Sequence, residues 1–398
     1  MNSICKLTRG EFTKIIKQKT AFIMAVIVAT VAIGMALIFG FIPQSATNAV
    51  LGTFNDPILQ IINSEVQNIE PNQYLTLPVL DDDDNITLDE YDNIIFEEVF
   101  TGTANWQGAL QNLVARSETA NEILNEQLST NIIFNANGEP RTMGGPERAL
   151  TLQVYNTNVR VINAANWFLE NDVEPQPNEN NNWNYIWLSL VVLATIILVG
   201  ALVVSSSIVS GESSNGTIKL LLIRPHKRWK ILTGKLLAST IYLLVMMIIA
   251  LILSVLAGFI LFGTAGTADV GPVHFGGTFM ILPAFALTIL TFAAMIPGFL
   301  LILSLAFMLS TLFKNAGLSI AMAMLLYFIV LPIAQSLAMF GATFLRFTIF
   351  THLDLSSYFL LTTPVEGQTP LLTVIMMAIH IIGFLALSYI FFTKRDAK

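Results

Sequence analysis

Apolar and polar residues alternate along this chain in long blocks. Six blocks contain about twenty or more residues with almost no charge, which is enough for a helix to cross the hydrocarbon core of a bilayer. They cover residues 21–42, 186–208, 237–262, 284–309, 317–340 and 371–392. The pattern predicts an all-α polytopic membrane protein with six transmembrane helices.

The composition supports this prediction. Of the 398 residues, 54% are hydrophobic and only 12% are charged, which is about half the charged fraction of a soluble globular domain. The composition therefore excludes the soluble enzyme classes. Cys5 is the only cysteine, so this sequence offers no pair for an internal disulfide.

Lysine and arginine residues predict the orientation, because short cytoplasmic loops are enriched in them. With six spans, 15 of the 20 basic residues fall on one side: before span one, between spans two and three, between spans four and five, and after span six. Both termini lie on that side. We expect a multi-pass protein of the cell (plasma) membrane with cytoplasmic N- and C-termini.

Segment 43–185, between the first two spans, differs in composition from the rest. It holds 21 of the 27 acidic residues, four arginines and no lysine, and long domains are translocated largely regardless of charge. Apolar residues recur at helical spacing in 106–128 and 148–169. We expect a large, acidic, mainly helical extracellular domain.

The acidic stretch 81–92 in this segment allows two interpretations. Asp81, Asp83 and Asn85 stand at the first, third and fifth positions of a calcium-binding EF-hand loop. However, Ile86 replaces the required glycine, and Asp92 replaces the bidentate glutamate. Deleting two residues would bring Glu90 to the last position, but the pattern is still damaged. A solvated acidic loop is the simpler interpretation, and calcium binding stays open.

The cytoplasmic loop 209–236 begins like a phosphate-binding loop. Gly211 is followed after four residues by Gly216, but Thr217 stands where such a loop needs its lysine, and a membrane helix precedes it instead of a strand. Apart from the damaged calcium pattern at 81–92, no other pattern indicates a nucleotide-binding, metal or catalytic site. We therefore expect no cofactor in this chain and no enzymatic activity of its own.

The same loop has the pattern of an elbow between two spans. We expect span two to continue as helix to about Glu212, followed by a turn and a short apolar helix "TIKLLLIR". Arg224 precedes Pro225, which ends one helix and can open the next. A short apolar helix outside the bilayer must bury against lipid headgroups or against a cytoplasmic partner.

The loop resembles the first cytoplasmic loop of ABC-2 type permeases, the membrane subunits of ABC exporters. The segment "STLFKNAG", 310–317, is similar to the second short cytoplasmic loop of that family. The six-span layout and the large external segment also fit one branch of the family. The matching positions in the first loop are Glu212, Gly216, Thr217, Leu221, Leu222, Arg224, Pro225, Arg228, Ile231, Gly234 and Lys235.

The resemblance implies a mechanism and partners. The loop helix would dock in a groove of a separate ATP-binding cassette subunit, which binds the ATP, and a second permease chain, identical or related, would complete the translocation path. Glu212 and Arg224 would fix the register of docking through charge pairs with the ATP-binding subunit. Glu212, Gly216, Thr217, Leu221, Leu222, Arg224, Pro225 and Arg228 are therefore our predicted coupling residues; no nucleic acid is expected.

The N-terminal segment 1–20 has the pattern of an amphipathic interfacial helix. It resembles the connecting helix that lies beside the ATP-binding subunit in the same family. A basic anchor on anionic lipid is the alternative. The predicted apolar face holds Ile4, Thr8, Phe12, Ile15 and Ile16, and the basic residues Lys6, Arg9, Lys14 and Lys17 lie mostly on the other face.

Several residues in or near the spans are candidates for special roles. His380 lies in the middle of span six, where we expect a neutral ring bonded to a neighbouring helix. Pro297–Gly298 and Pro332 predict kinks in spans four and five, with gating hinges as the alternative. Segment 341–370 is expected to be an extracellular re-entrant or interfacial segment, in which the side chains of Arg346, His352 and Asp354 remain exposed to water.

Two other functions remain as alternatives to the permease. One is a membrane-anchored receptor whose acidic external domain binds a ligand without transport. The other is an ion-coupled transporter, which usually shows several buried charges and an internal repeat. The transported substrate is not specified by the sequence, because relatives of this type export drugs, peptide antibiotics, lipids or sodium.

Overall fold

The computed structural model describes most of the chain and places six helices that are long and apolar enough to span a membrane. The described residues are 2–41, 57–67, 72–78, 96–103, 105–134, 139–175, 182–217, 227–263, 270–275, 278–340, 342–359, 365 and 367–394. The spans are α2 (Lys19–Phe41), α7 (Asn182–Ser207), α10 (Arg228–Phe262), α11 (Ala284–Leu312), α12–η1–α13 (Ala316–Met339) and α14 (Pro370–Lys394). The predicted polytopic, mainly helical architecture is confirmed.

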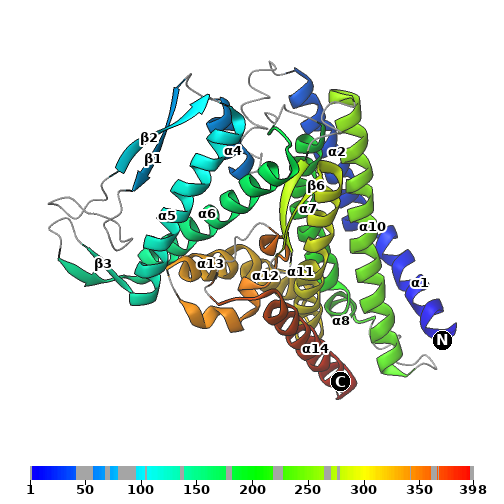
Figure 1. Cartoon of the computed structure of the whole chain (residues 1–398). Helices are drawn as coiled ribbons and strands as arrows, with labels where there is room; N and C mark the ends of the chain where they lie inside the picture. The colour runs from blue at the N-terminus through cyan, green and yellow to red at the C-terminus, as the bar shows by residue number, and fades with distance from the viewer. Residues whose placement is uncertain are drawn as a thin grey trace.

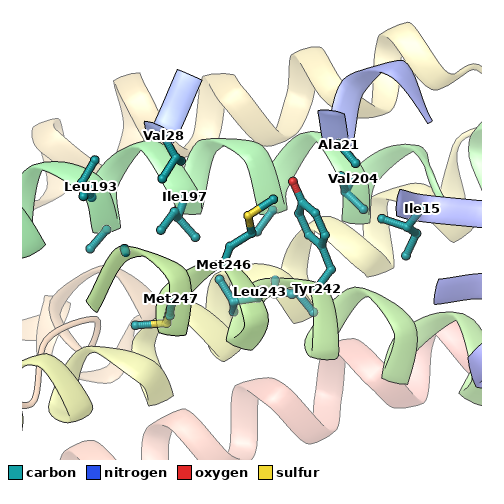
Figure 2. Packing of buried hydrophobic residues seen from close by; sticks show 14 of the residues in the cluster. Ile15, Ala21, Val28, Leu193, Ile197, Val204, Tyr242, Leu243, Met246 and Met247 are labelled. Atoms are coloured by element: carbon teal, nitrogen blue, oxygen red, sulfur yellow. The ribbon is translucent and has the colours of Figure 1, made fainter. Parts of the chain in front are cut away.

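Helix α7 forms the centre of the span bundle. It packs against α2, α10, α11 and α12, and Leu193 and Ile197 of α7 meet Val28 of α2 and Met247 of α10 in the core (Figure 2). Helix α2, the fifth span α12–η1–α13 and helix α14 instead expose large apolar side chains, such as Phe328 of η1 and Ile382 of α14. Such outward-facing apolar surfaces suit contact with lipid or with another membrane subunit.

The N-terminal helix α1 (Asn2–Lys17) precedes α2 and is separated from it by a bend at Gln18. It lies along the first part of α10, and the buried side chains that face α10 include Thr8, Glu11 and Ile15. A helix is present within the segment 1–20, but it ends at Lys17, three residues before the predicted boundary; its role as a cytoplasmic connecting helix stays a prediction. A buried acidic residue on its apolar face was not predicted.

Span five does not run as a regular α-helix. A π-helical turn, η1 (Leu326–Val330), separates α12 (Ala316–Leu325) from α13 (Leu331–Met339). Pro332 lies at the start of α13 and has no N–H to donate to the preceding turn, so the helix is irregular at the predicted place. In span four, Pro297 lies inside the single helix α11.

Segment 43–185 contains two long antiparallel helices, α5 (Trp106–Thr130) and α6 (Gly145–Asn171), at the places where helical spacing predicted them. With α4 (Pro57–Gln67) they share an apolar core around Ile62, Leu110 and Phe168. Two antiparallel hairpins, which were not predicted, accompany them: β1 (Asn72–Pro78) with β2 (Phe96–Thr103), and β3 (Ile132–Phe134) with β4 (Pro140–Thr142). The acidic stretch 81–92 lies outside the described residues.

A third antiparallel hairpin, β5 (Val270–Phe275) with β6 (Thr278–Pro283), links α10 to α11. Ile281 of this hairpin packs on the α4–α5–α6 core, so the hairpin and that core lie at the same end of the span bundle. The N- and C-terminal ends of the described chain lie at the opposite end (Figure 1). This arrangement agrees with an even number of spans.

In the described residues between α13 and α14 the chain forms three short 3-10 helices: η2 (Thr343–Phe347), η3 (Ile349–Thr351) and η4 (Ser356–Tyr358). Asp354 is exposed, as expected, and Arg346 is half-buried. His352 is fully buried, so the prediction that its side chain remains exposed to water is wrong. It contacts Arg346 before it in the chain and Gln368 and Thr373 after it, as described below.

Candidate functional site

The C-terminal end of α7 differs from the prediction. Helix α7 ends at Ser207, Ile208 and Val209 form a turn, and a short helix, α8 (Ser210–Ser214), follows. Span two therefore does not continue unbroken to Glu212. Serine hydroxyls compete for backbone groups near the break: Ser207 Oγ donates to the Val203 carbonyl at 2.7 Å, and Ser210 Oγ donates to the Ser206 carbonyl at 2.7 Å.

The break is stabilised from a second helix. Ser310, near the end of α11, accepts hydrogen bonds at its Oγ from the backbone N–H groups of Val209 (3.0 Å) and Ser210 (3.1 Å). These are the kind of N–H groups that a helix start leaves without an intrahelical acceptor. Ser310 is fully buried, so its hydroxyl takes the place of water at this position.

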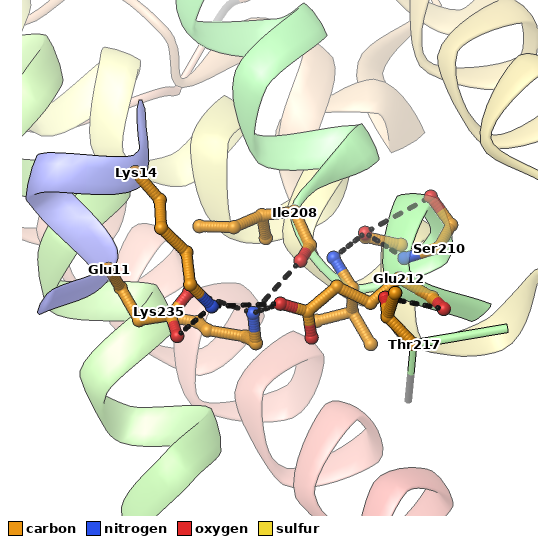
Figure 3. Close-up of polar contacts among 9 residues, drawn as sticks. Glu11, Lys14, Ile208, Ser210, Glu212, Thr217 and Lys235 are labelled. Atoms are coloured by element: carbon orange, nitrogen blue, oxygen red, sulfur yellow. Dashed lines mark hydrogen bonds and ion pairs between the residues drawn. The ribbon is translucent and has the colours of Figure 1, made fainter. Parts of the chain in front are cut away.

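Lys235 of α10 is the central residue of the site. Its side chain is only 1% exposed, and its Nζ lies 2.9 Å from Glu11 Oε2 and 2.8 Å from Glu212 Oε1. It also donates to the carbonyl oxygen of Ile208 at 3.2 Å (Figure 3). An ammonium group has three donors, and these three contacts use all of them. One lysine thus connects α1, the α7–α8 break and α8.

Lys14 closes the cluster on its solvent side. Its Nζ lies 2.8 Å from Glu11 Oε1 and 3.3 Å from Glu212 Oε1, and its side chain is 48% exposed. Two carboxylates and two ammonium groups therefore alternate, with no net charge. We call Glu11, Lys14, Glu212 and Lys235 the junction cluster.

The charges of the cluster shift the proton affinities of its members. Burial alone would raise the pKa of Glu11, but the positive charges of Lys235 and Lys14, with their hydrogen bonds, outweigh it and hold that pKa below its ordinary value. Burial alone would lower the pKa of Lys14, but the hydrogen bond and charge of Glu11, followed by Glu212, raise it. Both residues are therefore charged at neutral pH, which keeps the cluster intact.

Gly216 and Thr217 continue from the cluster into the loop. Gly216 has a φ of +71°, a left-handed conformation that favours glycine, and its N–H donates to the Ser213 carbonyl. Thr217 Oγ1 donates to the Glu212 carbonyl at 3.3 Å. The glycine and the threonine therefore turn the chain directly after Glu212, which explains why these two types suit these positions.

Only part of the predicted coupling set can be placed. Glu212, Gly216 and Thr217 lie together, whereas Leu221, Leu222, Arg224 and Pro225 lie outside the described residues. Arg228, at the start of α10, donates to the carbonyl of Thr393 near the end of α14, at 3.1 Å. The loop is thus anchored at both ends, by the junction cluster and by α14. Glu212 pairs within its own chain, which differs from the predicted charge pair with a partner.

Sequence reasoning missed Glu11, Lys14 and Ser310 as site residues and gave Lys235 no role of its own. A signal for Glu11 was present. Only six acidic residues lie outside segment 43–185, at positions 11, 212, 269, 354, 366 and 396. Glu11 and Glu212 are the two that precede apolar spans on the basic side. Lysine and arginine side chains are available there as ion-pair partners.

His380 also differs from expectation. Its Nδ1 lies 2.7 Å from the carbonyl oxygen of Met376, one turn earlier in its own helix, and its ring contacts Phe384. The expected bond to a neighbouring helix is therefore wrong. Among the residues that the structure describes, no group of three His, Cys, Asp or Glu side chains is placed to hold a metal ion.

Comparisons with known proteins place the chain in a family. An uncharacterized protein, YhcI, of Bacillus subtilis (strain 168) is 30% identical over 234 residues, which cover 57% of this chain and 74% of YhcI. An uncharacterized membrane protein, YdbK, of the same organism is 28% identical over 218 residues, covering 54% of this chain and 84% of YdbK. No solved structure matches. Residues 155–397, more than half of the chain, match the family described as "Protein of unknown function (DUF2705)", and the chain belongs to that family.

Proposed function

We propose that this chain is the permease subunit of an ATP-driven exporter of the ABC-2 type. It would form the translocation path with a second permease chain, and a separate ATP-binding subunit would dock on the loop 209–236. Three observations support the proposal: the six apolar helices, the resemblance of the loop, and a relative named as a membrane protein.

The observation that carries the proposal is the burial of Lys235 between Glu11 and Glu212. Glu212 belongs to the first turn of α8 at the start of the loop, Lys235 to span α10 and Glu11 to α1. A displacement applied to the loop would therefore move these elements together, because separating them would leave buried charges without partners. Such a junction can transmit force from a docked subunit to the spans.

The mechanism follows from this connection. ATP binding would bring two ATP-binding subunits together and push the docked loops. The junction cluster would pass that movement to α10 and α1, while Ser310 would pass it to α11 through the α7–α8 break. The spans would then tilt as units. This chain contributes binding and force transmission, and hydrolysis takes place on the partner.

The proposal is tested by purifying the tagged chain together with an ATP-binding subunit encoded next to it in the genome. We expect the two to copurify and the complex to hydrolyse ATP, whereas the chain alone shows background turnover only. Robust hydrolysis by the chain after removal of every copurifying protein would contradict the proposal. So would failure of the chain to associate with any ATP-binding subunit of its host.

The orientation is a separate part of the proposal, with cytoplasmic termini and segment 43–185 outside the cell. Ser214 and Asn125 are both exposed, so single cysteines at these positions in a Cys5→Ser background report on opposite sides. We expect an impermeant thiol reagent to label Asn125→Cys in intact cells and Ser214→Cys only after permeabilisation. The reverse labelling, or labelling of both from one side, would refute the orientation.

A further inference from the structure

The segment 343–359, between α13 and α14, is inserted among the spans; we call it the strap. The carbonyl of Leu353 lies so close to Gly298 that a Cβ at Gly298 would stand 1.7 Å from its oxygen. Gly298 is near the middle of the 29-residue helix α11. The strap therefore reaches about half-way along a spanning helix, and the missing side chain of Gly298 makes room for it.

Apolar contacts hold one side of the strap. Ile349 is buried with Leu301 and Leu305 of α11 and Met377 of α14. The strap thus fills the space between two spans that pack directly on each other elsewhere. Its release would open that space, so whatever holds the strap in place controls access to the seam between α11 and α14.

A buried polar cluster holds the other side. His352 is fully buried, with its Nε2 2.7 Å from the carbonyl oxygen of Arg346 and its Nδ1 2.9 Å from Thr373 Oγ1 of α14. Gln368 Nε2 lies 2.9 Å from the same Nδ1. Thr373 Oγ1 is also hydrogen-bonded to the hydroxyl of Tyr358. One threonine on α14 therefore joins the ring and the end of the strap.

The hydrogen-bond partners define the state of the His352 ring. The Arg346 carbonyl can only accept, so Nε2 carries a proton. Gln368 Nε2 also donates to the Thr351 carbonyl at 2.8 Å, which fixes the orientation of the amide and turns its donor toward Nδ1. The ring is thus neutral with Nδ1 as an acceptor. A second proton on Nδ1 would face a donor and place a charge in a fully buried site.

In the described elements around His352, no ionisable group supplies a negative charge that would stabilise the protonated ring. Arg346 precedes it on η2, Tyr358 is neutral, and His380 lies two turns beyond Thr373 on α14. The Asp354 carboxylate is exposed and accepts from the backbone N–H and the hydroxyl of Ser356. Helices α11 and α13 carry no ionisable side chain, and Glu366 lies outside the described residues.

We propose that His352 is a proton-operated latch: the neutral ring fastens the strap to α14, and protonation releases the strap from the seam between α11 and α14. The direction follows from the environment. Burial lowers the pKa of His352, the Arg346 carbonyl acts in the opposite sense, and His380 lowers it further. A lowered pKa means that the stabilisation is complete above the ordinary histidine pKa and is lost as the pH falls through the lowered value.

The latch can be tested in the full chain, in lipid nanodiscs, where both faces meet the same pH. A cysteine replaces the buried Ser356 in a Cys5→Ser background, and its rate of thiol labelling is divided by that of a cysteine at the exposed Ser129. The ratio removes the intrinsic pH dependence of the thiol reaction. Between about pH 8 and pH 5, the range in which histidine titrates, we expect the ratio to rise at least about threefold.

His352→Gln is the matched control, because its amide can still donate to the Arg346 carbonyl but does not titrate in this range. Its ratio should be the same at both pH values. If that variant does not fold, Thr373→Val, which removes the shared hydroxyl, should raise the ratio at about pH 8 in protein that keeps its His352. A flat ratio in the chain with His352, or an equal rise in His352→Gln, would overturn the latch. Neither result depends on the ATP-binding partner.

Discussion

Lys235 Nζ lies 2.9 Å from Glu11 Oε2, although the two residues stand 224 positions apart in the chain. The pair joins α1 to α10, and Glu212 joins the same lysine from α8. The contact holds together three segments that an apolar core alone would leave free to slide. In the proposed exporter, it is the point at which movement of the loop becomes movement of the spans.

The first prediction concerns the removal of the buried cation. Lys235→Met should lower the free energy of unfolding by about 3 kcal/mol, because Glu11 and Glu212 would lose their buried counter-charge. Lys14→Met is the matched control at the exposed edge of the cluster and should cost at most about 1 kcal/mol. Unfolding of the purified protein in detergent measures both. Equal costs for the two variants would contradict the central place of Lys235.

The second prediction concerns the α7–α8 break. Ser310→Ala leaves the N–H groups of Val209 and Ser210 without their buried acceptor, which should cost about 1–3 kcal/mol. Ser319 is equally buried, and in the described part of the chain its hydroxyl has no partner. Ser319→Ala should therefore be nearly neutral. The break would not depend on Ser310 if both variants unfolded at the same denaturant concentration as the original chain.

The third prediction concerns the close contact between α11 and the strap. Gly298→Ala places a methyl group on the Leu353 carbonyl and must displace it, because a helix backbone cannot yield by the required distance. We expect a lower unfolding midpoint and faster labelling of a cysteine at Ser356. Gly383→Ala, in α14, meets no atom within 4 Å and should be neutral or slightly stabilising. Similar behaviour of the two alanine variants would argue against an inserted strap.

The fourth prediction is a pH dependence at the junction cluster. The pKa of Glu11 is held below its ordinary value of 4.5, so its stabilisation is complete above that value and is lost as the pH falls through the lowered one. The difference in unfolding free energy between the original chain and Glu11→Gln should be constant from about pH 8 to pH 6. It should shrink only below the ordinary carboxylate range. A difference that already changes near neutral pH would be inconsistent with this pairing.

The spans could be predicted from the sequence because their signal is local. Twenty apolar residues in a row can satisfy their backbone in a bilayer only as a helix, and the observed ends of α11 and α14 lie within three residues of the expected ones. Helices α5 and α6 followed from their apolar spacing for the same reason. These elements need no knowledge of what they pack against.

The site could not be predicted in this way, because its contacts join distant parts of the chain. The end of α7 depends on Ser310, about 100 residues later, and the burial of His352 depends on Gln368 and Thr373. The sequence around Glu11 gave it no role, because its partner Lys235 lies 224 positions away in the chain. The errors at the end of α7 and at His352 arose where a partner distant in the chain overrode the local pattern, whereas His380 bonds within its own helix.

The docking of the loop on an ATP-binding subunit is the central claim, and Leu221 and Leu222 test it most directly. Burying one leucine side chain is worth about 1.5–3 kcal/mol, so changing both to serine should weaken association with the partner by about two to four powers of ten. The control is Leu150→Ser on the exposed face of α6, which should leave association unchanged.

The decisive measurement is the dissociation constant between the detergent-purified chain and the proposed ATP-binding subunit, together with hydrolysis coupled to export in proteoliposomes. We predict that the Leu221→Ser, Leu222→Ser chain inserts and folds normally but loses association with the partner or coupled hydrolysis. Association and coupled hydrolysis both at the level of the original chain would contradict the account.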